Sequence, residues 1–143
     1  MKSNEAHAKW DGNLQEGNGS MVLKSVEQEF PFTFSTRFGD EKGPNPEELI
    51  AAAHSGCFSM AFSHALAEAG YKPKSIKTTA KVSVEQDGEG FRISRSELET
   101  DAEVPGIEQE KFEELAEEAK VNCPVSKALS SLEIELKANL TNK

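Results

Sequence analysis

Residues 45–70 read NPEELIAAAHSGCFSMAFSHALAEAG, and this stretch predicts one long helix. Asn45 is a favoured N-cap residue, Pro46 fits the first helical position, and Glu48 stands at the reciprocal position of a capping box. The rest is rich in Ala, Leu and Met and stops at Gly70, a residue favoured just past a helix end. Because the helix is apolar nearly all round, we expect it to be buried between layers or in a dimer.

Strand patterns precede this helix. Residues 6–38 contain two strand-like runs, residues 21–26 and residues 30–38, separated by glycine-rich and acidic turns. The pattern predicts two or three antiparallel strands.

A hairpin pattern follows the helix. Apolar and polar residues alternate over residues 76–84, and residues 87–90 then turn the chain into a return strand. The apolar positions of the return strand change from odd to even numbers, so we expect a β-bulge between Ser94 and Glu97.

The C-terminal third predicts helices and a last strand. Residues 110–120 carry apolar residues at helical spacing, Pro124 favours a new short helix over residues 125–130, and residues 132–140 alternate as a strand. The order of elements indicates a single α+β domain over residues 1–143 with mainly antiparallel pairing. One chain supplies too few strands to cover the long helix, so we expect a homodimer.

The acidic composition argues against one class of partner. The 143 residues include 16 basic and 25 acidic side chains, a formal net charge of −9. Such a surface repels a nucleic-acid backbone. Serines and histidines interrupt the apolar helix, and the N-terminus lacks a basic-then-apolar signal pattern. We therefore expect no nucleic-acid partner, no membrane partner and a cytoplasmic location.

Two cysteines are candidates for chemistry. Inside cells, where structural disulfides are disfavoured, such cysteines are inert, metal-bound or catalytic. Ser55 and Gly56 can kink the helix and leave Cys57 near a new helix N-terminus, and Cys123 directly precedes Pro124, a typical first helical residue. Both sulfur atoms would then lie where a thiolate is favoured.

The histidines near Cys57 give weak support for a metal site. His54 is three residues before Cys57 on the same helix face, whereas His64 lies seven residues after it, a rise of about 10 Å. That distance is too long for one ion to bind both ends. We expect no metal, and each histidine to be hydrogen-bonded in the core or exposed.

Arg37 has two open interpretations. Most arginines are solvated surface charges. The alternative is a fixed cation that stabilises a thiolate, with Glu47 or Glu48 holding its planar guanidinium through two hydrogen bonds. Glu47 lies ten residues before Cys57, a rise of about 15 Å in a straight helix. It can therefore act on the sulfur only through Arg37.

Several blocks of sequence match the pattern of a known family, in the same order and over nearly the whole chain. The first two blocks are Ala8-Lys9-Trp10-Asp11-Gly12 and Thr36-Arg37-Phe38. The third runs from Asn45-Pro46-Glu47-Glu48-Leu49 through the stretch Ala52–Met60, and the fourth joins Ala119-Lys120 with Cys123-Pro124-Val125-Ser126. The two cysteine blocks together are highly specific, unlike either cysteine alone. The sequence resembles the OsmC/Ohr family, and within it the OsmC branch.

The resemblance implies a fold and a function. The fold is an intertwined homodimer with mainly antiparallel sheets around long central helices. The function is thiol-dependent reduction of organic hydroperoxides in oxidative and osmotic stress. Cys57 corresponds to the peroxidatic cysteine, Cys123 to the resolving cysteine, Arg37 to the activating arginine, and Glu47 to the carboxylate that orients it.

The resemblance also bears on cofactors and partners. It implies no metal and no organic cofactor, and a dithiol reductant, for which a lipoyl-type dithiol is a candidate. Four apolar residues are expected to suit a bulky alkyl tail: Phe38, Phe58, Met60 and Phe62. The competing hypothesis is a non-catalytic redox-sensing or ligand-binding dimer that uses the same cysteine pair.

Overall fold

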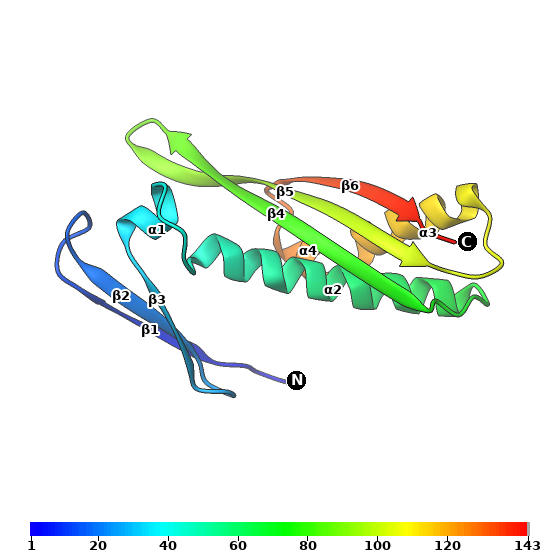
Figure 1. The fold of residues 1–143 in the computed structure, drawn as a ribbon, viewed down its shortest axis with the longest axis horizontal. Helices are drawn as coiled ribbons and strands as arrows, with labels where there is room; N and C mark the ends of the chain where they lie inside the picture. Colours follow the sequence, from blue (N-terminus) through cyan, green and yellow to red (C-terminus); the bar gives the residue numbers. More distant parts are fainter. Residues whose placement is uncertain (143) are drawn as a thin grey trace. The chain divides into compact units, whose positions relative to one another are not determined.

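A computed structural model describes residues 1–142, which form an α+β structure of two compact units. The first unit covers residues 1–49 and the second begins at Ile50. Each unit is described by itself below. The order of the helices and strands along the chain can be followed in Figure 1.

The first unit is an antiparallel sheet followed by a short helix. Strands β1 (Ala6–Asp11), β2 (Asn18–Leu23) and β3 (Gln28–Phe32) pair in the order β1-β2-β3. The prediction of two or three antiparallel strands is confirmed.

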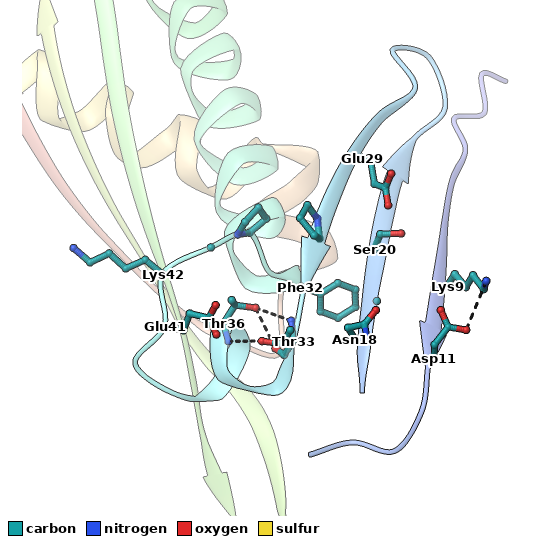
Figure 2. A pocket seen from close by; sticks show the side chains of 14 residues that line it. Lys9, Asp11, Asn18, Ser20, Glu29, Phe32, Thr33, Thr36, Glu41 and Lys42 are labelled. Atoms are coloured by element: carbon teal, nitrogen blue, oxygen red, sulfur yellow. Dashed lines mark hydrogen bonds and ion pairs between the residues drawn. The ribbon is translucent and has the colours of Figure 1, made fainter. Parts of the chain in front are cut away.

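The predicted strand over residues 30–38 is wrong in its second half. The strand ends at Phe32, and residues Phe34–Phe38 form the helix α1. Thr33 and Thr36 cap this helix reciprocally: the Thr36 amide donates to Thr33 Oγ1 at 3.2 Å, and the Thr33 amide donates to Thr36 Oγ1 at 2.8 Å (Figure 2). The capping box outweighs the strand preference of the phenylalanines. Arg37 therefore lies in a helical turn, not at a strand end.

Helix α2 (Pro46–Glu68) begins and ends as predicted. The Glu48 amide donates to Asn45 Oδ1 at 2.9 Å, and Gly70 adopts the left-handed backbone conformation with φ of +92°. The expected kink at Ser55-Gly56 is wrong, because α2 is helical throughout. Gly56 is exposed, and the Ser55 hydroxyl donates to a carbonyl one turn back on the same helix.

The second sheet contains β4 (Ser75–Asp87), β5 (Gly90–Glu103) and β6 (Glu133–Leu140), in that order. Strands β4 and β5 form the predicted hairpin. Ser94 is the extra residue of β5 opposite the Ser83/Val84 register shift, so the bulge lies at the edge of the predicted interval.

Strand β6 pairs with β5 in parallel, and their arrows point the same way in Figure 1. The chain makes this crossover through α3 (Gln109–Asn122) and α4 (Pro124–Ala128), close to the predicted helices. Residues from α2, α3 and β5 and from the loop after β5 form the core, and the fully buried ones include Phe58, Phe62, Leu66, Phe112, Ala102 and Val104.

Within residues 1–142, α2 is the one helix long and apolar enough to cross a membrane by length and composition. This test is weak evidence, because core helices of soluble proteins also pass it. One face of α2, marked by Phe58, Phe62 and Leu66, is fully buried in the core. The structure thus accounts for the apolar character of that face without a lipid bilayer.

Candidate active site

The two cysteines lie side by side. Cys57 is in the middle of α2, and Cys123 is the N-cap residue between α3 and α4. Their Sγ atoms are hydrogen-bonded at 2.9 Å, and both thiols are free. This separation exceeds the length of a disulfide bond, about 2.05 Å, by less than one ångström. Little movement is needed to join them.

The sulfur atoms differ in exposure. Cys57 is half-buried, whereas Cys123 is fully buried. Solvent therefore reaches part of Cys57 and none of Cys123. This arrangement can support attack by one sulfur followed by resolution by the other.

The sulfur atoms also differ in acidity. Burial raises the pKa of the Cys57 thiol, and its hydrogen bond with Cys123 adds to the effect. Burial also disfavours the Cys123 thiolate, but hydrogen bonds from Cys57, the Ser126 amide and hydroxyl, and the Val125 amide lower the pKa of Cys123 overall. The helix-start environment expected for both cysteines exists only at Cys123, where α4 begins.

Arg37 and Glu47 form a close ion pair in the first unit. Arg37 Nη2 donates to Glu47 Oε1 at 2.9 Å, and Arg37 Nε donates to the same oxygen at 3.1 Å. Glu47 is buried, with 5% of its surface exposed, while the neighbouring Glu48 is exposed. The guanidinium also lies 4.9 Å from the centre of the Phe38 ring. With a third hydrogen bond, from Nε to Glu47 Oε2 at 3.3 Å, the carboxylate and the ring hold the cation in a fixed orientation.

An aromatic pocket of about 460 Å³ includes Arg37. Its other lining residues include Trp10, Leu14, Phe32, Phe34 and Phe38. Of the four residues expected to suit an alkyl tail, Phe38 alone lines this pocket. Phe58 and Phe62 are buried in the core of the second unit, and Met60 is 78% exposed on α2. Phe58, Phe62 and Leu66 follow one another at helical spacing, so they lie on the same face of α2, and this face is buried in the core.

A second pocket of about 470 Å³ in the first unit has a different character. Charged side chains of both signs line it, among them Lys9, Asp11, Glu29, Glu41 and Lys42 (Figure 2). Its polar walls do not suit an alkyl group, in contrast to the aromatic pocket at Arg37.

His54 is fully buried and hydrogen-bonded at both ring nitrogens. Nδ1 lies 2.7 Å from Ser96 Oγ on β5, and Nε2 lies 2.8 Å from Ser126 Oγ on α4. Burial lowers the pKa of His54, so the neutral imidazole is favoured. The predicted hydrogen-bonded core histidine is confirmed here, whereas His64 is exposed.

Sequence reasoning did not assign a role to Ser96 or to the Ser126 side chain. The one available signal was the position of Ser126 within the Cys123 block. Within residues 1–142, no group of three or more His, Cys, Asp and Glu side chains is arranged to hold a metal ion.

Comparison with known proteins agrees with this architecture. Residues 39–137 match the family model of OsmC-like proteins. Over 141 residues the chain is 45% identical to Peroxiredoxin OsmC of Escherichia coli, covering 96% of this chain and 97% of that protein. The chain belongs to the OsmC-like protein family.

Relatives of the organic hydroperoxide resistance type are more distant. The chain is 35% identical over 98 residues to Organic hydroperoxide resistance protein-like 1 of Staphylococcus saprophyticus, covering 67% of this chain and 69% of that one. An organic hydroperoxide resistance protein structure from Elizabethkingia anophelis superposes with a TM-score of 0.70 at 30% identity, and each chain is covered completely. The structure of OhrB from Bacillus subtilis gives a TM-score of 0.73 at 24% identity, with 94% and 98% coverage.

Proposed function

We propose that this OsmC-like protein reduces organic hydroperoxides to alcohols, with Cys57 as the attacking thiol and Cys123 as the resolving thiol. Family membership, with 45% identity to a peroxiredoxin, supports a peroxidase enzyme. The observation that carries the cysteine assignment is that Cys57 is partly exposed and its sulfur lies 2.9 Å from the sulfur of the fully buried Cys123.

The proposed chemistry has two steps. The Cys57 thiolate attacks the distal peroxide oxygen; an S–O bond forms, the O–O bond breaks, and the alkoxide takes a proton and leaves as an alcohol. The Cys123 sulfur then attacks the Cys57 sulfenic acid; the S–S bond forms, the S–O bond breaks, and the hydroxide leaves with a proton as water. A dithiol restores both thiols by disulfide exchange.

The aromatic pocket at Arg37 supports an organic substituent on the peroxide. Its walls are mostly apolar, with Thr33 as a further polar side chain, and the guanidinium contributes a fixed cation. We propose that Arg37, held by Glu47, favours the thiolate of Cys57.

Steady-state kinetics test this function. With a lipoyl-type dithiol as reductant, we expect multiple turnovers and a kcat/KM at least about 10-fold higher for cumene hydroperoxide than for hydrogen peroxide, because an apolar pocket binds the aryl group. A monothiol should support slower turnover. Oxidation of one equivalent of protein with no cycling would instead favour the redox-sensing or ligand-binding dimer.

We further propose that a single domain over residues 1–143 assembles as a homodimer in the cytoplasm. The face of α2 opposite the buried phenylalanines is exposed and carries Ala53, Gly56 and Met60. A Cβ at Gly56 would meet nothing within 4 Å, so this face has room for another surface. A second copy of the chain is the proposed occupant.

Sedimentation measures the assembly. We expect a dimer at micromolar concentration, and Met60→Lys should shift it towards monomer because a buried unpaired charge is costly at an interface. Val121→Lys is the matched control, because Val121 is also an exposed apolar residue on a helix, at 60% exposure. A folded monomeric parent protein would rule out the dimer.

A further inference from the structure

We propose that Ser96, His54 and Ser126 form a buried hydrogen-bond chain that aims a hydroxyl donor at the Cys123 sulfur and so prepares it to attack Cys57. This inference rests on the proposed function for its role in catalysis. The chain itself can be tested without peroxide.

The geometry of the chain is continuous. From β5, Ser96 Oγ contacts His54 Nδ1 at 2.7 Å; from α4, Ser126 Oγ contacts His54 Nε2 at 2.8 Å. Ser96 and His54 are fully buried, and Ser126 is 5% exposed. Ser126 stands three residues after Cys123, in the first turn of α4, and its hydroxyl is among the donors that lower the pKa of Cys123. His54 of α2 is therefore connected through Ser126 of α4 to the buried Cys123 thiol, and Ser96 of β5 stands at the other end of the hydrogen-bond chain.

The number of available protons allows two arrangements, and one of them leaves a donor for the Cys123 sulfur. A serine hydroxyl has a single proton to donate and can accept hydrogen bonds as well. If His54 Nε2–H donates to Ser126 Oγ, the Ser126 proton remains free to point at the Cys123 sulfur. His54 Nδ1 then accepts the hydroxyl proton of Ser96. The opposite tautomer would draw the Ser126 proton to His54 and remove the donor from the sulfur.

Burial favours a ring with a single N–H. It lowers the pKa of His54, which favours the neutral imidazole, and a neutral ring has one N–H for its two serine partners. Two titratable groups of α2 face the Cys123 sulfur: the Cys57 thiol directly and the His54 ring through Ser126. Helix α4 contributes the Val125 and Ser126 amides. A directed hydroxyl adds a further donor to the thiolate.

The chain acts on the second step of the proposed reaction. Cys123 attacks as a thiolate, becomes oxidised as the S–S bond forms, and displaces hydroxide from the Cys57 sulfur. The proton lost by the Cys123 thiol leaves with that hydroxide as water, so no external oxidant or acid is required. Ser126 and His54 are positioning residues here, because they act through Cys123.

A second hydroxyl chain, half-buried at Ser59 and Thr78, supplies the control. Ser59 Oγ donates to Thr78 Oγ1 at 2.7 Å, and Thr78 Oγ1 lies 3.0 Å from Thr100 Oγ1. This chain also links α2 to the β4–β5 hairpin, and Thr100 is fully buried on β5 like Ser96. Thr100→Val thus removes a buried hydroxyl from the same strand without touching His54.

The first test measures Cys123 directly. Because the protein has two cysteines, Cys57→Ser leaves Cys123 as the sole thiol, and the ultraviolet absorbance of its thiolate can be titrated. Adding Ser126→Ala should raise the pKa of Cys123, since a donor to the thiolate is lost. His54→Leu should also raise the pKa of Cys123. His54→Gln should raise it by less, because the glutamine side-chain amide can still donate to Ser126. Thr100→Val should leave the titration unchanged.

The second test separates the two reaction steps. After one equivalent of cumene hydroperoxide is mixed with otherwise unmodified reduced protein, Ser126→Ala should consume peroxide at the parent rate but form the disulfide about 10-fold more slowly. His54→Leu combined with Ser126→Ala should be no slower than Ser126→Ala alone, because one chain carries both effects. If His54→Leu does not fold, Ser96→Ala takes its place.

The outcomes distinguish this inference from the proposed function. An unchanged pKa of Cys123 in Ser126→Ala, or an equal shift of that pKa in Thr100→Val, overturns the proposed role of the hydrogen-bond chain. Additive slowing in the double variant overturns it as well. If the pKa of Cys123 shifts as expected but the parent protein does not reduce peroxide, the hydrogen-bond chain is supported and the proposed peroxidase activity is refuted.

Discussion

Replacing Cys57 with serine is expected to abolish peroxide reduction. A serine hydroxyl is far less acidic and less nucleophilic than a thiol, so the first step loses its attacking atom. Cys123→Ser should behave differently. It should still consume about one equivalent of hydroperoxide and then stall as the sulfenic acid, or oxidise further, because the second sulfur is missing.

Peroxide consumption and intact mass of each variant measure this difference. Mass spectrometry should find one added oxygen on Cys123→Ser, and a loss of two hydrogens when the parent protein forms its disulfide. The comparison also tests the order of the cysteines, because the lowered pKa belongs to Cys123 and the raised one to Cys57. If Cys57→Ser still reacts with peroxide while Cys123→Ser does not, Cys123 is the attacking thiol.

Features specified by neighbouring residues were predictable from the sequence. The ends of α2 follow from Asn45 and Gly70, because capping depends on residues within one turn. The bulge at Ser94 follows from the change in apolar parity along one strand. The buried face of α3 consists of the four residues predicted from helical spacing: Phe112, Leu115, Ala116 and Ala119.

Features that depend on distant residues were not predictable in the same way. Period-two alternation marks residues 133–140 as a strand but carries no direction, so the parallel pairing of β6 was not anticipated. His54 contacts residues 42 and 72 positions away. A motif centred on Cys57 contains His54 but neither of its partners, so the hydrogen-bond chain required the folded structure.

Two predictions that rested on phenylalanine residues were wrong. The phenylalanine content favoured a strand at residues 34–38, where the Thr33–Thr36 capping box forms a helix instead. It also favoured a substrate role for Phe58 and Phe62, but in the core Phe58 packs tilted against Phe62 and Phe62 packs edge-on against Phe112. Aromatic side chains serve cores and pockets equally well, and the surroundings decide between them.

Arg37→Ala is expected to lower the peroxidase rate by at least about 10-fold, because a neighbouring cation favours a thiolate by one or more pKa units. The need for such a cation is clear at Cys57, where burial and the contact with Cys123 raise the pKa of the thiol. Arg92→Ala is the matched control. Arg92 is an exposed arginine that also pairs with a glutamate, at 3.0 Å from Glu85.

Glu47→Gln should have a smaller effect than Arg37→Ala. The cation remains, but a neutral amide holds the guanidinium less firmly than the carboxylate that now accepts hydrogen bonds from Nε and Nη2. Glu48→Gln, which changes an exposed neighbour, should have no effect. The readout is the pH dependence of Cys57 alkylation, which should move to higher pH in Arg37→Ala and by less in Glu47→Gln. If Arg37→Ala leaves both the alkylation profile and the peroxide rate unchanged, Arg37 is not the activating cation. The Val125 amide, a donor that lowers the pKa of Cys57, is then a candidate to stabilise its thiolate.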